Sequence, residues 1–222
     1  MRMSFRLKSL SRAVHEEQQH EHEHDEVQEH RNSGVGLCTS LTVWRKSLLM
    51  SCKGFTVIDS DGNLVYRVDN YIGRPEEVIL MDASGNSVLT MRRRWVKLGL
   101  VDSWNVYEGE MGNHCKATKS SKAPSCWVRK KVNIFHSNPN VLAYVYREAS
   151  DKQYAYVIQG SYAHRSCKVL DESKRVLAEI KRKEAMTGGI SFGIEVFQLV
   201  VHPEFDAGFA MGLVLLLDQM FS

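Results

Sequence analysis

The stretch Asp206-Ala-Gly-Phe-Ala-Met-Gly-Leu-Val-Leu-Leu-Leu-Asp-Gln-Met-Phe221 decides the fold, because it has a helical pattern and is apolar on nearly every face. Pro203 and Asp206 supply a helix start. The uninterrupted apolar run 207–217 is about half as long as a bilayer-crossing helix needs. A helix that is apolar all round belongs inside a core. We therefore predict a core helix over about residues 205–221.

Upstream of this helix, short β-branched and aromatic runs alternate with Asp, Asn, Ser and Gly, which is typical of strands and turns. Three segments have the same hairpin pattern of strand, turn and strand: 54–68, 78–91 and 167–180. The turn of the third segment lacks the glycine that the other two turns have. Further strand-like runs are 103–108, 125–132, 141–147, 153–158 and 194–201. About twelve strands fit, which predicts a mainly β antiparallel barrel or sandwich.

The bulk composition fits one globular domain of 222 residues, with 43% hydrophobic residues available for a core. A formal net charge of +3 is too small to indicate nucleic-acid binding by itself, so any basic site must be local. The five cysteines form no Cys-x-x-Cys pair, which favours reduced thiols in a reducing compartment. No window has the roughly 20 consecutive apolar residues of a transmembrane helix, and the first residues lack the apolar stretch of a secretory signal, so we expect neither. We expect an intracellular, cytoplasmic monomer, with a peripheral plasma-membrane or nuclear location as the open alternatives.

The N-terminal segment 1–36 differs from the rest, because it is rich in His and Glu and poor in apolar residues. Such a segment buries too little surface to offset its ordering entropy, so we predict a disordered tail. Its first fourteen residues combine apolar positions at helical spacing with basic residues. A membrane-surface helix or an organellar targeting peptide is the alternative for that part. The folded domain is expected over residues 37–222.

Five stretches of this domain carry a resemblance to a known family: 41–48 (LTVWRKSL), 54–59 (GFTVID), 65–70 (VYRVDN), 88–94 (VLTMRRR) and 211–221 (MGLVLLLDQMF). In this order they resemble the plant LURP-one-related proteins, a family of the Tubby-like superfamily that includes the phospholipid scramblases. The resemblance covers about residues 37–222. It implies a Tubby-like closed antiparallel barrel of about twelve strands around a central hydrophobic C-terminal helix.

The resemblance implies less about activity. The family has no established catalysis, and it is described in relation to membrane-tethered transcription factors, lipid-binding relatives and plant defence. From the residues themselves, a search for a nucleophile elbow, a Walker-type loop, a dinucleotide fingerprint, a zincin helix and a Cys-His site finds none. We therefore expect no enzyme and no cofactor.

Clustered positive charge on predicted strands is the main functional signal. Guanidinium and ammonium groups at adjacent strand ends bind phosphates, which suits a phosphoinositide headgroup. The ordinary alternative is a solvated outer barrel face, since period-two alternation puts Arg92 and Arg94 on one face and Arg93 on the other. The candidate lipid- or phosphate-binding residues are Arg92, Arg94, Lys97, Arg129, Lys131, Lys181 and Lys183.

Two possible metal sites are weaker. The sequence 59–63 resembles the first half of a calcium loop, but Leu64 and Asn70 stand where that loop needs Gly and Glu, so a turn is expected. His20, His22 and His24 alternate without a fixed scaffold, which favours adventitious binding. We expect no metal site.

Together these observations predict a non-enzymatic binding or scaffold module for anionic membrane phospholipid or a protein partner, with a part in plant defence signalling as a further expectation. The alternatives are a membrane-tethered transcription regulator that binds DNA and, less favoured, a phospholipid scramblase. Scrambling is disfavoured because the hydrophobic helix ends in Asp218-Gln219 and is needed by the core.

Overall fold

The computed structural model describes residues 36–49, 52–69, 76–94, 102–111, 123–132, 140–183 and 193–222. The predicted tail, up to residue 35, and Lys97 lie outside these residues. The strands are β1 (Thr39–Trp44), β2 (Phe55–Ile58), β3 (Leu64–Val68), β4 (Glu77–Asp82), β5 (Ser87–Arg94), β6 (Ser103–Glu108), β7 (Cys126–Lys130), β8 (Val141–Tyr146), β9 (Tyr156–Ser161), β10 (Ser166–Asp171), β11 (Val176–Arg182) and β12 (Val196–Val201). One helix follows, α1 (Ala207–Phe221).

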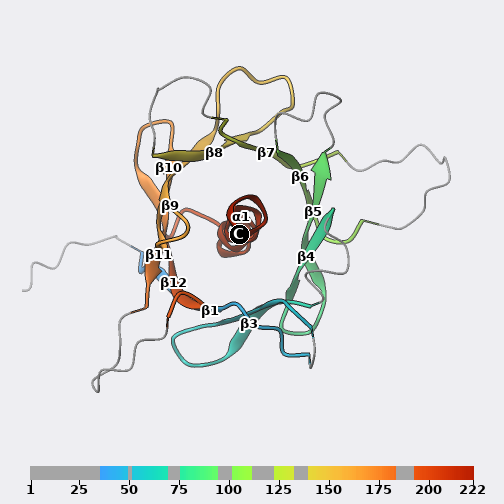
Figure 1. Cartoon of the computed structure of the whole chain (residues 1–222), viewed down its shortest axis with the longest axis vertical. Coiled ribbons are helices and arrows are strands. Elements are labelled where there is room, and N and C mark those ends of the chain that lie inside the picture. Colours follow the sequence, from blue (N-terminus) through green and yellow to red (C-terminus); the bar gives the residue numbers. More distant parts are fainter. Residues whose placement is uncertain are drawn as a thin grey trace, which may run out of the picture. The chain divides into compact units, whose positions relative to one another are not determined.

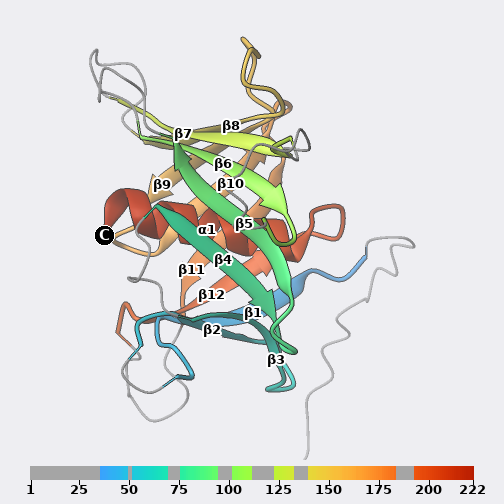
Figure 2. The same cartoon turned by 90° about the vertical axis from the view of Figure 1, so that its right-hand side faces the viewer.

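The strands form a closed antiparallel barrel in which each strand pairs with its neighbours in sequence. Strand β12 returns to pair with β1, from Thr39 opposite Val201 to Trp44 opposite Val196, and this pairing closes the ring. Figure 1 looks along the barrel and shows α1 in its centre, and Figure 2 shows the helix from the side between the walls. The predicted barrel around a central C-terminal helix is confirmed.

The core is the contact between inward side chains of the wall and the surface of α1. Strand β8 illustrates the wall, since Val141, Ala143 and Val145 are buried and the residues between them are half-buried. Helix α1 is buried from Ala210 to Asp218 without interruption, as a helix surrounded on all sides must be. A Cβ added at Gly212 would lie 2.8 Å from Leu89 Cδ1, so glycine lets the helix approach β5 closely.

The start of α1 follows the predicted signal. Asp206 is the N-cap, and its Oδ1 accepts a hydrogen bond from the backbone N–H of Phe209 at 2.6 Å. The helix begins at Ala207, two residues after the predicted start, because Phe205 closes a turn with its N–H bonded to the His202 carbonyl. No helix among the described residues is long and apolar enough to cross a membrane.

The three predicted hairpins share one turn geometry. The carboxylates of Asp59, Asp82 and Asp171 each accept a hydrogen bond from the backbone N–H four residues later, at 2.8, 2.8 and 2.9 Å. The bonds from Asn63 lower the pKa of Asp59. The third turn lacks glycine, and Lys174 takes the left-handed backbone there with φ of 62°. The turn predicted at 59–63 is thus confirmed.

Strand bounds agree with the predictions within two residues except at the end of β5, which extends three residues past the predicted 91 to Arg94, and at β9. The sequence predicts a strand at 153–158, whereas β9 is Tyr156–Ser161. The ring of Tyr154 packs on that of Tyr144, with centroids 5.1 Å apart, and Ala155 N–H bonds to the Val145 carbonyl. The apolar residues before Tyr156 therefore belong to the connection from β8, and the predicted bounds are wrong by three residues.

The barrel has two ends, named here after the helix. Because α1 starts after β12 and runs back through the barrel, its N-terminus and the turns β2–β3, β4–β5 and β10–β11 share one end, the α1-N end. The last turn of α1 lies at the other end, the α1-C end, with the connections β1–β2, β9–β10 and β11–β12. Figure 2 shows the C-terminus at this end.

Candidate functional site at the basic end of the barrel

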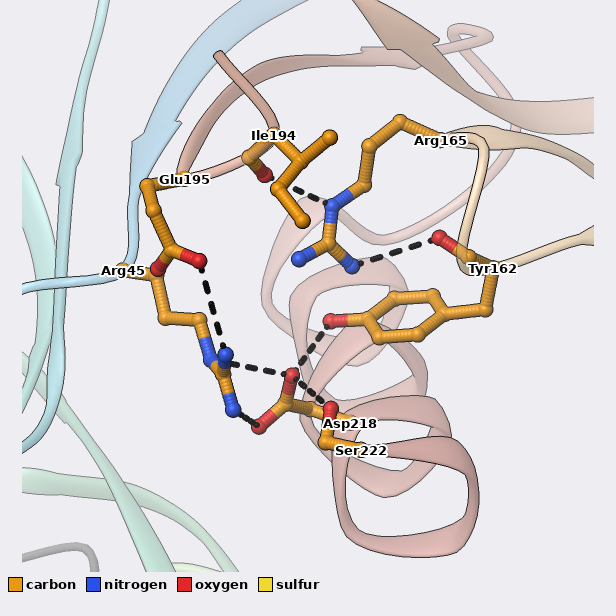
Figure 3. A network of polar contacts seen from close by, with 7 residues as sticks. All are labelled: Arg45, Tyr162, Arg165, Ile194, Glu195, Asp218 and Ser222. Atoms are coloured by element: carbon orange, nitrogen blue, oxygen red, sulfur yellow. Dashed lines mark hydrogen bonds and ion pairs between the residues drawn. The ribbon is translucent and has the colours of Figure 1, made fainter.

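A buried carboxylate organises the α1-C end. Asp218 is 1% exposed, yet two side chains from distant segments and one from the end of its own helix converge on it (Figure 3). Arg45, one residue past β1, places Nε 3.2 Å from Oδ1, and the Tyr162 hydroxyl donates to the same oxygen at 3.0 Å. Ser222 Oγ donates to it at 2.7 Å. The wall of the barrel is thereby tied to the last turn of α1.

Other inward cations compensate the end of the helix. The last turn of α1 contains no basic residue, although its free carbonyls carry partial negative charge. Lys130, at the end of β7, donates to the Met220 carbonyl and lies 4.3 Å from the Phe221 ring centroid. Residues of the barrel wall therefore supply the positive charge that the helix lacks.

Arg165 is the most buried of these cations, at 3% exposure. Its Nε donates to the Ile194 carbonyl at 2.9 Å, and its guanidinium carbon lies 4.2 Å from the Tyr162 ring centroid. Burial, and then the charge of Asp218, raise the pKa of Tyr162 far above that of a free tyrosine. We refer to Arg45, Lys130 and Arg165 as the inner cations.

The predicted set omits the inner cations, since Arg45 and Arg165 lie outside the clusters on which it was based and Lys130, between Arg129 and Lys131, is not among its residues. A signal for two of them exists in the period-two pattern. Arg45 comes two positions after the buried Val43, and Lys130 comes two positions after the buried Val128. Both therefore continue the inward face of a strand to its end.

The two ends of the barrel differ in charge among the described residues. The α1-N end is mainly acidic, with Asp59, Asp61, Asp82, Glu108, Glu110, Glu148, Asp151, Asp171, Glu172, Glu204 and Asp206 against Arg147, Lys152, Lys174 and Arg175. The α1-C end is mainly basic, with the inner cations, Lys46, Lys53, Arg92, Arg93, Arg94, Lys131, Arg182 and Lys183 against Asp69, Glu76, Glu77, Asp102, Glu195 and Asp218. Because neighbouring strands are antiparallel, successive connections alternate between the two ends of the barrel. The charged residues of every second connection therefore lie at the same end.

Two predicted site residues are held in ion pairs. Arg92 lies opposite Glu77 in the β4–β5 ladder, and their side chains form an ion pair. Lys181 pairs with Glu179, which also binds Lys168 at 3.1 Å. The hydrogen bond from Lys181 contributes most to lowering the pKa of Glu179. An anionic ligand would have to compete with these carboxylates.

The other predicted residues are spread over both sides of the barrel. Arg129 lies along the outer wall, with its guanidinium 4.6 Å from the Tyr146 ring centroid and bonded to the Ala149 carbonyl at 2.7 Å. Lys131 is half-buried just after β7. Lys183 follows β11, which is separated from β7 by β8, β9 and β10 around the ring (Figure 1), and donates to Thr42 Oγ1 at 2.7 Å. The predicted set therefore does not converge on one point.

A smaller group keeps its charge at the surface of the α1-C end. Lys53 and Arg94 are exposed and make no contact with a carboxylate among the described residues. Arg182 and Lys183 bond to neutral oxygens, and Lys46 lies over the ring of Trp44. We call this group the basic rim: Lys46, Lys53, Arg94, Arg182 and Lys183.

The α1-N end has a polar hollow of about 340 Å³. Arg175 lies in it and is already paired with Asp171 at 2.8 Å and with Glu204 at 3.6 Å. Its floor includes Tyr156 and Phe205, whose rings meet edge to face at 5.3 Å. The acids and the internal ion pairs make this hollow unfavourable for an anion.

The fold also brings together two pairs that one sequence cannot place. Ser161 Oγ lies 2.7 Å from His164 Nδ1 within the β9–β10 connection, and Cys38 Sγ lies 3.7 Å from His202 Nδ1. Both pairs are at the surface, and no carboxylate orients either imidazole among the described residues. A catalytic dyad ordinarily has such an orienting group, which these pairs lack.

Comparisons with known proteins agree with this architecture. Residues 39–218 match the family model described as LURP-one-related. The chain is 52% identical to Protein LURP-one-related 17 of Arabidopsis thaliana, over 97% of this chain and 98% of the relative. It is 47% identical to LURP-one-related 8 of the same plant, over 82% of this chain and 86% of the relative. An X-ray structure of an Arabidopsis thaliana protein superposes with a TM-score of 0.56 at 23% identity, covering 82% of this chain and 90% of that one.

Proposed function

The chain belongs to the LURP-one-related family, and from that premise we propose that it is a non-enzymatic binding module whose basic rim docks on the anionic phospholipid of a membrane surface. The observation that carries the proposal is the separation of charge between the two barrel ends. A molecule with one basic and one acidic end is oriented by a negative surface, which attracts one end and repels the other.

The basic rim is suited to this role because its charge is not used inside the fold. Arg45 serves Asp218, Lys130 serves the end of α1 and Arg92 serves Glu77. Arg165 is bonded to the Ile194 carbonyl. Lys53 and Arg94 are exposed, and no described carboxylate neutralises them. Each basic residue near an anionic leaflet contributes about 1 kcal/mol to binding. The rim as a whole therefore supports reversible attachment.

In this proposal two of the thiols serve packing rather than catalysis. Cys126 and Cys167 are buried, and burial raises the pKa of Cys126 to about 12 and of Cys167 to about 11. At neutral pH both stay protonated, which makes them poor nucleophiles. They are packing residues of the barrel wall.

The test is co-sedimentation of the full chain with vesicles of phosphatidylcholine alone and of phosphatidylcholine with about 20% phosphatidylserine or about 5% phosphoinositide. The variant combines Lys46→Glu, Lys53→Glu and Arg94→Glu. Its matched control combines Arg147→Glu, Lys152→Glu and Lys174→Glu at the α1-N end. All six side chains are exposed, so folding should tolerate both sets.

Wild type should sediment with the anionic vesicles, and less so as salt rises from about 0.1 M to about 0.5 M. The rim variant should lose at least about a hundredfold in partitioning, and the control should bind as wild type. Equal losses in both variants, or no binding by wild type, would contradict the proposal. Salt-sensitive binding to duplex DNA without vesicle binding would favour the transcription-regulator alternative instead.

A further inference from the structure

Exposed apolar side chains gather at the same end as the basic rim. The large hydrophobic residues exposed among the described ones are Leu37, Trp44, Leu48, Leu49, Val132, Tyr154 and Ile194. All except Leu37 and Tyr154 lie at the α1-C end. Single exposed apolar residues need no explanation, but a group on one face marks an interaction surface.

Four of these residues lie on two adjoining connections. Trp44 ends β1 and pairs with Val196 at the start of β12, and the next residue, Arg45, bonds through its N–H to the Glu195 carbonyl at 2.9 Å. Ile194 precedes Glu195, while Leu48 and Leu49 follow Arg45 after three and four residues. We call Trp44, Leu48, Leu49 and Ile194 the apolar cap.

Hydrogen bonds hold the backbone of the apolar cap against the barrel. Thr56 Oγ1 donates to the Lys46 carbonyl at 2.7 Å, and the Leu49 N–H bonds to Ser47 Oγ at 3.0 Å. The Ile194 carbonyl accepts from the buried Arg165 (Figure 3). The backbone that carries these side chains is therefore held in place, so little backbone entropy is lost when they bind.

Cations surround the apolar cap. Lys46 Nζ lies 5.1 Å from the centroid of the Trp44 ring, and Lys53, four residues after Leu49, is exposed. Trp is favoured at membrane interfaces because its large ring is apolar while its N–H remains polar. Lys places its apolar stem along a hydrophobic surface and its ammonium in water or on phosphate.

We propose that the apolar cap inserts into the outer hydrocarbon layer of an anionic leaflet while Lys46 and Lys53 contact the lipid phosphates. This inference rests on the proposed function and adds to it a second, salt-resistant component of binding. A lipid surface fits better than a second copy of the chain, because two-fold pairing through this face would bring two basic rims together.

The experiment compares wild type, the double variant Leu48→Ser with Leu49→Ser, and the matched control Leu37→Ser. Leu37 is 93% exposed but lies at the α1-N end. Each full-length chain is sedimented with vesicles of phosphatidylcholine and about 20% phosphatidylserine at about 0.1 M and about 0.5 M salt. Tryptophan quenching by lipids brominated on their acyl chains is measured for wild type and Trp44→Phe.

At the higher salt, the double variant should partition about tenfold less than wild type, while Leu37→Ser should not change. Brominated lipid should quench wild type, and most of this quenching should disappear in Trp44→Phe. If the double variant binds as wild type at both salts while the rim variant loses binding, insertion is wrong and the proposed function stands. If wild type binds no anionic vesicle, both are wrong.

Discussion

Tyr162 and Asp218 are 56 residues apart in sequence, and the tyrosine hydroxyl donates to the buried carboxylate at 3.0 Å. The contact joins the β9–β10 connection to the last turn of α1 inside a barrel whose interior is otherwise mainly apolar. A buried carboxylate is tolerated only when hydrogen bonds and an opposite charge replace its lost hydration. Arg45 supplies that charge, and Tyr162 and Ser222 supply the hydrogen bonds.

We predict that Arg45→Met lowers the free energy of unfolding by about 3 kcal/mol, because it leaves Asp218 without its counter-charge. This is the low end of the range for buried pairs, since the Arg45 side chain is 33% exposed. Tyr162→Phe removes only one hydrogen bond and should cost about 1–2 kcal/mol. Urea unfolding at neutral pH measures both.

Glu195→Gln is the control for this pair of variants. Glu195 lies 3.6 Å from Arg45, but half of its side chain is exposed, so its loss should change stability by less than about 0.5 kcal/mol. A cost for Glu195→Gln equal to that of Arg45→Met would show that the surface ion pair, and not the buried carboxylate, governs stability at this end.

Stability should fall at alkaline pH because of the buried thiols. The pKa of Cys126 rises from 9.0 to about 12 through burial, so the unfolded chain loses this proton at a lower pH than the folded chain does. The thiol contribution is therefore fully present below pH 9.0 and declines as pH rises toward about 12. Cys126→Ala should reduce the slope of unfolding free energy against pH by about 1.4 kcal/mol per pH unit in this window. If the unfolding free energies of wild type and Cys126→Ala fell with pH at the same rate, the slope could not be attributed to the Cys126 thiol.

The turn between β10 and β11 should be improvable by one substitution. Lys174 has a φ of 62° at the position where the first two hairpins have Gly62 and Gly85. A left-handed conformation costs a side-chain-bearing residue about 1 kcal/mol, so Lys174→Gly should stabilise the fold by about 0.5 kcal/mol after the greater backbone entropy of glycine is counted. The reciprocal Gly62→Lys should destabilise it by about 0.5 kcal/mol on the same account. The midpoint temperature of thermal unfolding should thus rise for Lys174→Gly and fall for Gly62→Lys.

The central helix should dominate the stability of the barrel. Leu213 is 1% exposed inside the barrel, and Leu213→Ala should cost about 3 kcal/mol through lost burial and the cavity that remains. The same change at Leu49, which is 48% exposed, should be nearly neutral in the absence of membrane. Denaturant unfolding measures the loss of unfolding free energy for both variants. A similar loss for the two would mean that the Leu49 side chain is packed against the barrel rather than exposed to solvent.

The sequence by itself determined the architecture, because the signals for it are local. A helix that is apolar on nearly all faces, as 206–221 is, must be buried on all sides. Period-two alternation marks the strands, and Asp residues mark the hairpin turns. The bounds predicted for the strand at 153–158 were wrong because Tyr154 is apolar enough for a strand but packs on Tyr144 in the connection. Local composition cannot distinguish those two uses of an aromatic ring.

Only the tertiary structure decided which charges act together. Arg45 meets Asp218 because β1 pairs with β12 and closes the ring, and Arg92 meets Glu77 because of the β4–β5 register. The sequence singled out Arg92 as a ligand-binding residue, whereas the period-two pattern after Val43 places Arg45 on the inward face without indicating its partner Asp218. Charge–charge contacts depend on distances of a few ångströms between residues far apart in the chain, and those distances are set by strand register and barrel closure rather than by any local pattern.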